Sequence, residues 1–194
     1  MPSVNESTKY THFSNIKVGT ANGGGGFELG GTAINATAAE LNAAADQSSW
    51  AALDPAADDA LTLAEHGVAT KVALLSEADG TTFTLPAASG TGATYTVIVS
   101  TTVTSNNHII QCANATDEFY GIIWQIDADT ADAVAAYPCR DADGFDTITM
   151  NGSTTGGIKG DRFEFTDVAA GHWNVKGFTT GTGTVATPLS AAVS

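Results

Sequence analysis

Short apolar runs alternate with polar turn residues over most of the chain from Gly67 onward. Within several runs, hydrophobic and polar side chains alternate one by one, as around Tyr95, Val97 and Val99. This period of two is typical of a strand that buries one face. The runs that predict strands are 71–76, 81–86, 93–100, 108–113, 119–127, 145–150, 161–167, 172–178 and 183–188. We therefore predict a mainly β domain over residues 67–194, an antiparallel β-sandwich or a jelly-roll-like fold.

Two local patterns add detail to this prediction. Asp79 and Gly80 separate the first two runs, and an Asp-Gly pair favours the tight turn of a β-hairpin. The run FYGIIWQI, residues 119–126, is apolar on both faces. We expect this strand to be buried on both sides, and a contact with another subunit is one way to cover its second face.

A capping box predicts a short helix near residue 37. Thr37 is followed three residues later by Glu40, so that each side chain can bond the backbone N–H of the other. Leu41 and the alanines after it give this helix almost nothing to bury. A helix without a core of its own needs contacts with other chains, so Thr37, Glu40 and Leu41 are our candidates for an anchor or interface.

A second short helix is predicted to begin at Asp54, with Pro55 in its first position and Gly67 after its end. Upstream, four consecutive glycines at 23–26 indicate a tether or a segment that orders on a partner. We therefore predict that residues 1–66 form an N-terminal arm or anchor with one or two short helices.

The charge of the chain argues against several partners. Its 194 residues include 7 Lys and Arg against 21 Asp and Glu, a net charge of −14. Such a surface repels a phosphate backbone, so no nucleic-acid partner is expected. No run approaches the ~20 apolar residues of a membrane span, and the N-terminus lacks the regions of a signal peptide. We expect neither membrane insertion nor export through a signal peptide.

Residues that could carry chemistry are scattered. The sequence has no P-loop, G-x-S-x-G or H-E-x-x-H motif, so we predict no enzyme activity, no catalytic residue and no cofactor. None of the four histidines stands at metal-ligand spacing from another ligand: His12, His66, His108 and His172. Cys112 is expected to be a buried reduced thiol, and Cys139 lies in a predicted loop. A disulfide between these two cysteines stays an open alternative.

Two acidic segments, DADTAD and DADGFD, place oxygen ligands at alternate positions, as calcium-binding loops do. An EF-hand loop is not completed, because Gly144 comes too early and position 152 is Gly. We interpret both segments as solvated turns, with a calcium ion held jointly by the two loops as the weaker alternative. The candidate ligands are Asp127, Asp129, Asp141, Asp143 and Asp146.

Two further groups of residues could act on sugars. Glu118, Glu164 and the two acidic segments could supply a carboxylate pair for glycoside hydrolysis if the fold placed two of these groups about 5 to 10 Å apart. Exposed aromatic side chains could stack on sugars, although the alternating spacing of these residues favours the core for most of them. The aromatic candidates are Tyr120, Trp124, Tyr137, Phe163 and Trp173.

Several segments resemble those of tailed-bacteriophage virion structural proteins. TAAELN, in a region rich in Gly, Thr and Ala, resembles a short element of phage fibre and virion proteins. Three later segments resemble the terminal β modules of phage decoration and fibre proteins: GTTFTLPAASGTGATYTVIV, IKGDRFEFTDVAAGHWNVKG and TGTVATP. The resemblance covers roughly residues 30–45 and 80–190.

This resemblance implies a non-enzymatic virion structural protein, and two interpretations follow. The first is a capsid decoration (cement) protein: a homotrimer, made in the host cytoplasm, that binds the major capsid protein and stabilises the capsid surface. The alternative is a short head or tail fibre or spike. In that case exposed loops, VTSNNH (103–108) and residues 127–144, would contact a host-surface glycan.

Overall fold

The computed structural model describes residues 27–29, 32–34, 51–53, 58–67, 71–129, 133–140 and 142–193. The chain divides into two compact units, Met1–Asp46 and Gln47–Ser194. In the first unit, β1 (Phe27–Leu29) and β2 (Thr32–Ile34) pair as a two-stranded antiparallel sheet. The helix predicted to begin at Thr37 lies outside the described residues.

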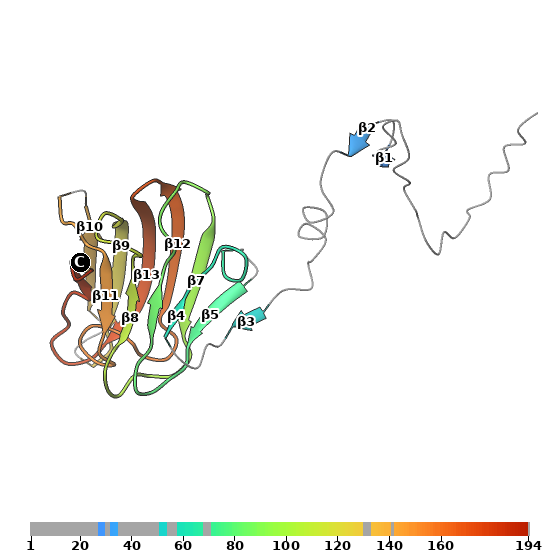
Figure 1. Cartoon of the computed structure of the whole chain (residues 1–194). Coiled ribbons are helices and arrows are strands. Elements are labelled where there is room, and N and C mark those ends of the chain that lie inside the picture. Colours follow the sequence, from blue (N-terminus) through green and yellow to red (C-terminus); the bar gives the residue numbers. More distant parts are fainter. Residues whose placement is uncertain are drawn as a thin grey trace, which may run out of the picture. The chain divides into compact units, whose positions relative to one another are not determined.

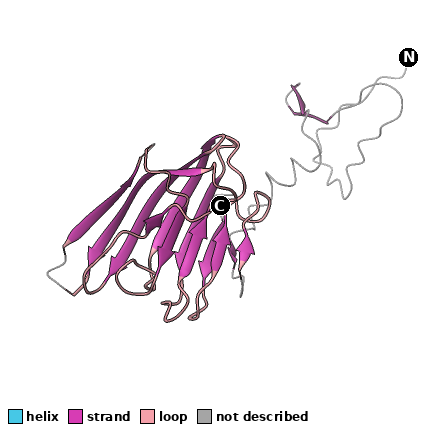
Figure 2. Ribbon diagram, turned by 60° about the vertical axis from the view of Figure 1, so that its left-hand side comes forward, coloured by secondary structure: helices cyan, strands magenta, loops and turns pink. Residues whose placement is uncertain are grey.

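Two mixed sheets make up the described part of the second unit (Figure 1). The seven-stranded sheet has the order β10 (Val134–Cys139), β9 (Glu118–Asp127), β13 (His172–Gly181), β12 (Arg162–Ala169), β7 (Thr94–Val99), β5 (Lys71–Leu75), β3 (Ala51–Leu53). The five-stranded sheet has the order β14 (Leu189–Ser190), β11 (Thr147–Met150), β8 (His108–Gln111), β6 (Thr82–Thr84), β4 (Asp59–Ala60). Strands and loops, with no helix, form the described part (Figure 2).

The expectation of purely antiparallel sheets is wrong, because the chain changes sheet after each of its early strands. β3, β5 and β7 belong to the seven-stranded sheet, and β4, β6 and β8 belong to the five-stranded sheet. A chain that crosses over and back returns in its original direction. Successive strands of each sheet are therefore parallel here: β3 with β5, β5 with β7, β4 with β6, and β6 with β8.

The predicted hairpin between residues 71–76 and 81–86 is wrong for the same reason. The turn itself forms, since the N–H of Gly80 donates to the carbonyl of Glu77 at 3.2 Å and Gly80 has a φ of 95°. The strands on either side of it, β5 and β6, pair in different sheets. The turn therefore leads from one sheet to the other.

Most predicted strands are confirmed, and several short or edge strands were not predicted. β5 to β9 and β11 to β13 fall on the first eight predicted runs. The ninth run, 183–188, is not a strand, and β14 forms directly after it. β10 lies where we expected a loop. It is an edge strand. Pro138 is tolerated there because the side of the strand that lacks its N–H has no neighbouring strand to bond.

Residues before Gly67 contribute to the second unit. β3 and β4 add one strand to each sheet, and Leu61 is a core residue with 2% exposure. The unit therefore extends to the N-terminal side of the boundary predicted after residue 66. The second predicted helix is wrong in its described part, where residues 59–60 are strand and 63–66 form a turn. The pairing of β4 with β6 and the burial of Leu61 outweigh the helix-start and helix-end residues that the local sequence offers.

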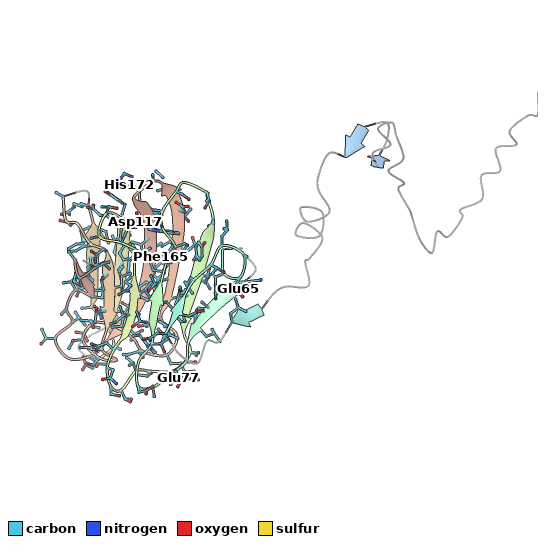
Figure 3. The ribbon with its side chains drawn as sticks, in the orientation of Figure 1. Glu65, Glu77, Asp117, Phe165 and His172 are labelled. Carbon is cyan, nitrogen blue, oxygen red and sulfur yellow. The ribbon has the colours of Figure 1, made fainter. Side chains whose placement is uncertain are left out.

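The core lies between the two sheets. Figure 3 shows Phe165 of β12 within it, and Phe165 is 0% exposed. The largest fully buried side chains come from strands of both sheets and from the segments next to them: Trp173, Tyr95, Phe83, Phe119, Phe163, Phe165, Leu75, Leu85, Ile110, Ile123, Ile148 and Met150. One hydrophobic cluster contains side chains from both sheets.

Four buried carboxylates hold loops against this core: Asp117, Asp146, Asp161 and Asp167. Asp117, for example, accepts hydrogen bonds from the N–H of Ala88 at 2.9 Å and from the side-chain amide of Asn114 at 3.0 Å. In each case hydrogen-bond donors of a loop or terminal segment converge on one carboxylate. Part of the acidic character of the chain is thus structural.

Asp161 shows what burial does to such a carboxylate. It accepts from the N–H groups of Gly157 at 2.8 Å, Ile158 at 3.1 Å and Thr180 at 2.8 Å. Burial raises the pKa of Asp161 from 3.8 to about 6, and these hydrogen bonds offset only part of the burial effect. The folded state therefore binds a proton at this site at pH values where the unfolded chain has lost it.

We expect the ionisation of Asp161 to lower stability as pH rises. Between about pH 3.8 and 6 the folded state holds more protons than the unfolded state at this site, so the free energy of unfolding falls with rising pH. The contribution lost across this window is roughly 3 kcal/mol. Urea unfolding of the wild type and of Asp161→Asn between pH 4 and 7 would measure it.

The comparison with Asp161→Asn matters because other groups titrate in the same range. Burial lowers the pKa of His108, which makes stability fall as pH drops below 6.5. His108 is present in both the wild type and Asp161→Asn, so subtracting their free energies of unfolding at each pH removes its contribution. NMR titration of the Asp161 carboxyl carbon gives an independent midpoint, and a midpoint near 4 would contradict the prediction.

Candidate interaction surface

Large hydrophobic side chains lie exposed on the outer face of the seven-stranded sheet. Trp124 and Ile126 of β9 are 40% and 48% exposed, Phe178 of β13 is 52% exposed, and Val134 of β10 is 60% exposed. The residues that alternate with them point inward, since Ile123 is fully buried. We call Trp124, Ile126, Val134 and Phe178 the apolar patch.

The strand register makes the apolar patch continuous. Phe178 is the register partner of Trp124 across the parallel pair β13 and β9. Val134 is the partner of Ile126 across the antiparallel pair β10 and β9. Partners of this kind have side chains close enough to touch on one face of a sheet. The patch therefore spans three neighbouring strands, which is typical of a surface that another molecule covers.

Charged side chains border the apolar patch on one side. Arg162 is the register partner of Phe178, and Glu164 is the partner of Lys176. The Lys176 ammonium lies 5.8 Å from the centre of the Phe178 ring, within the range of a cation–π contact. These four residues line a pocket.

The two cations beside the patch have no ion-pair partner among the described residues. The ion pair present in the described part of the chain joins His66 and Asp59, whose atoms are 3.8 Å apart. Glu164 faces Lys176 across the strands without approaching within ion-pair distance. Arg162 and Lys176 are therefore available to carboxylates of another molecule.

A separate polar group lies at the start of β9 and β13. The Tyr120 hydroxyl donates to the Glu118 carboxylate at 3.1 Å, and the rings of Tyr120 and His172 are 4.6 Å apart. Figure 3 shows His172 at one end of the second unit, opposite the end that carries Glu77. Glu118 and His172 are also register partners across β9 and β13.

The structure does not bring Glu118 and Glu164 together. Glu118 is the register partner of His172, and Glu164 is the partner of Lys176, four positions further along β13. Four residues of a strand span about 13 Å, which exceeds the separation that glycoside hydrolysis requires. A paired-carboxylate site at these two residues is not formed.

The calcium candidates are used for backbone hydrogen bonds instead of forming one site. Asp129 accepts from the N–H of Gly183 at 2.8 Å, and Asp143 accepts from the N–H of Arg140 at 2.9 Å. Asp146 accepts from the C-terminal segment, and Asp127 accepts from the N–H of Asp129. Across the described residues, no three metal-ligating side chains come together. Asp141 lies outside the described residues.

Both cysteines are free and buried, so the alternative of a disulfide between them is not realised. Cys112 is fully buried, as predicted. Burial raises the pKa of the Cys139 thiol to about 12, so this thiol is protonated at neutral pH and unreactive. Cys139 lies on β10 rather than in the loop predicted for it.

The aromatic candidates differ in burial, and Tyr120 and Tyr137 are half-buried. Trp173 and Phe163 are fully buried, as predicted, whereas Trp124 is exposed. The expectation that residues 119–126 are buried on both sides is therefore wrong for this chain alone, because Trp124 and Ile126 on the outer face are exposed. Ile126 was part of the predicted run, but Val134 and Phe178 were not singled out as exposed. Alternation shows which residues share a face of a strand, not whether that face is covered.

The anchor candidates Thr37, Glu40 and Leu41 lie outside the described residues. Where the chain is described, no helix has the length and apolar character to cross a membrane. No family model, curated protein or solved structure matches this chain.

Proposed function

We propose that this chain is a non-enzymatic structural protein of a bacteriophage virion, a capsid decoration protein that binds the major capsid protein and stabilises the head shell. The observation that carries the proposal is the apolar patch, an exposed apolar surface through which copies of the chain can pack side by side on a shell. In this proposal the two mixed sheets pack face to face as a β-sandwich. The resemblance of TAAELN and of the later segments to phage virion proteins supports the same role.

Decoration stabilises a shell by mass action. A protein that binds the assembled shell but not its separated subunits shifts the equilibrium toward assembly, and many copies add their contributions. In this proposal the N-terminal unit is the anchor and the second unit covers the shell. The net charge of −14 keeps unassembled copies soluble.

The copy number on purified particles tests this function. A decoration protein should be present at a fixed ratio to the major capsid protein, in hundreds of copies per particle. Quantitative mass spectrometry of particles, with labelled peptides of both proteins, measures that ratio. A few copies per particle would contradict decoration and would favour a fibre or spike at one vertex.

Rebinding to stripped particles tests the anchor. Full-length chain should bind, and residues 47–194, the second compact unit, should not. Circular dichroism of the truncated chain serves as the control for folding. Binding of the full chain should hold or strengthen as salt is added, because screening weakens repulsion between copies. A steep loss with salt would instead show that basic patches of the shell hold this acidic protein.

The alternative function, a short fibre or spike that binds a host-surface glycan, is favoured by one observation. Trp124 and Phe178 are adjacent, exposed aromatic side chains with polar groups beside them, an arrangement that can stack on sugar rings. A glycan array probed with the full chain and with Trp124→Ala tests this alternative. Specific binding that Trp124→Ala abolishes would support it.

A further inference from the structure

We propose that the apolar patch is the contact through which copies of this chain associate, so that a second copy covers Trp124, Ile126, Val134 and Phe178. The proposal rests on the proposed function only in its stoichiometry, for which the decoration role predicts a trimer. The contact itself follows from three observations on the described residues: the clustering of apolar side chains, the charges beside them and the form of the sheet edge.

Clustering distinguishes these four side chains from other exposed hydrophobic residues. Val168 and Leu63 are 52% and 50% exposed, values close to that of Phe178, but Leu63 lies in a turn and Val168 lies at the far end of β12. The members of the apolar patch are instead register partners on three adjacent strands. A contiguous apolar area rimmed by polar residues is the usual form of a protein contact.

The charges beside the patch favour a second copy as its occupant. Two copies with a net charge of −14 each repel one another over most orientations. Along one side of the patch, however, Arg162 and Lys176 have no ion-pair partner among the described residues, and Glu164 lies two residues from Arg162 on β12 and opposite Lys176 on β13. A surface that carries both signs side by side can pair with the same surface of a neighbouring copy, across a two-fold or around a three-fold axis, because the Glu164 of one copy can meet the cations of the next.

The sheet edge next to the patch indicates contact through the face instead of through the edge. β10 is the outermost strand on this side, and an open edge would invite another chain to add a strand. Pro138 lies on β10 and has no N–H to donate, so a continuous ladder cannot form there. Copies therefore associate by covering the outer face, which gives a closed assembly instead of an extended sheet.

Sedimentation velocity of the full chain from micromolar to submillimolar concentration tests the contact. The wild type should sediment as a multiple of its 19.7 kDa mass, with the trimer expected. Phe178→Lys should weaken association by about tenfold or more, because a charge replaces one of the four apolar side chains of the contact. Val168→Lys is the matched control, since it adds the same charge at the same exposure and should associate as the wild type does.

A second measurement reports on the patch directly. Association buries Trp124, so tryptophan emission of the wild type should shift to shorter wavelength as concentration rises, and this shift should be absent in Trp124→Phe. Circular dichroism of each variant excludes unfolding as the cause. If the wild type is a dimer that Phe178→Lys dissociates, the proposed contact is supported and only the expected trimer is contradicted. The copy number on particles then decides the proposed function.

Three results would overturn the proposed contact. The first is a wild type that stays monomeric at all concentrations. The second is an oligomer that Phe178→Lys leaves intact, because the contact would then lie elsewhere, for example in the N-terminal unit. The third is a monomer that binds a glycan through Trp124, because the patch would then serve the alternative function.

Discussion

Trp173→Ala should lower the free energy of unfolding by about 3–5 kcal/mol, the range for removing a large aromatic side chain from a core. Trp173 is 0% exposed and packs edge-on against Tyr95, with ring centres 5.4 Å apart. Its register partners are Phe119 on β9 and Asp167 on β12. Alanine would leave a large void among side chains that cannot all move to fill it.

Urea unfolding followed by circular dichroism measures this loss, and the midpoint of thermal unfolding should fall by roughly 6–20 °C. Trp124→Ala is the matched control, because Trp124 is 40% exposed and its loss should cost about 1 kcal/mol or less. Trp173→Phe should cost clearly less than Trp173→Ala, because it keeps most of the ring and removes an indole N–H that has no hydrogen-bond partner among the described residues. A loss below about 1 kcal/mol for Trp173→Ala would contradict the buried position.

Alternation of apolar and polar residues predicted the strands of this core well, because it is a local property. Phe163 and Phe165 alternate with Glu164, and the structure buries both aromatic rings. The same pattern contains nothing about which sheet a strand joins. β5 and β6 are separated by an Asp-Gly turn that favours a hairpin, yet each finds its partners in a different sheet. Sheet membership depends on contacts distant in sequence, so local turn chemistry could not reveal it.

The candidate surface was harder to predict than the core. Trp124 lies in a run that is apolar on both faces, and such a run favours burial on both sides. Phe178 follows Gly177 at the end of an alternating run, where nothing marks it as exposed. The pattern identified a strand with two apolar faces correctly. It could not show that the second face lacks a cover within one chain.

The buried carboxylates were missed for a different reason. Composition favours reading 21 acidic residues as a solvated surface, and most acidic residues in proteins are exposed. Asp167 lies at the end of an alternating strand, at the register shift between β12 and β13, and its hydrogen-bond donors are more than seventy residues away. Only the folded chain brings residues 89–91 to it.

Asp167→Ala should lower the free energy of unfolding by about 3 kcal/mol, because several donors lose one buried acceptor. The Asp167 carboxylate accepts from the N–H groups of Ser89 at 2.9 Å, Gly90 at 2.7 Å and Thr91 at 3.0 Å, and from the Thr91 hydroxyl at 2.8 Å. Asp167→Asn should recover only part of the loss, because its amide group would direct N–H toward donors on one side.

The pH dependence separates loss of the charge from loss of packing. Burial by itself would raise the pKa of Asp167, but the bonds from Thr91, Gly90 and Ser89 outweigh burial, so the pKa lies below 3.8. A depressed pKa stabilises the folded state above the unfolded value, and this contribution is lost as pH falls through the folded value. The stability difference between the wild type and Asp167→Asn should therefore be full above about pH 5 and shrink below about pH 3.8. A difference that stays constant down to pH 2.5 would mean that shape, not charge, makes Asp167 the anchor of residues 89–91.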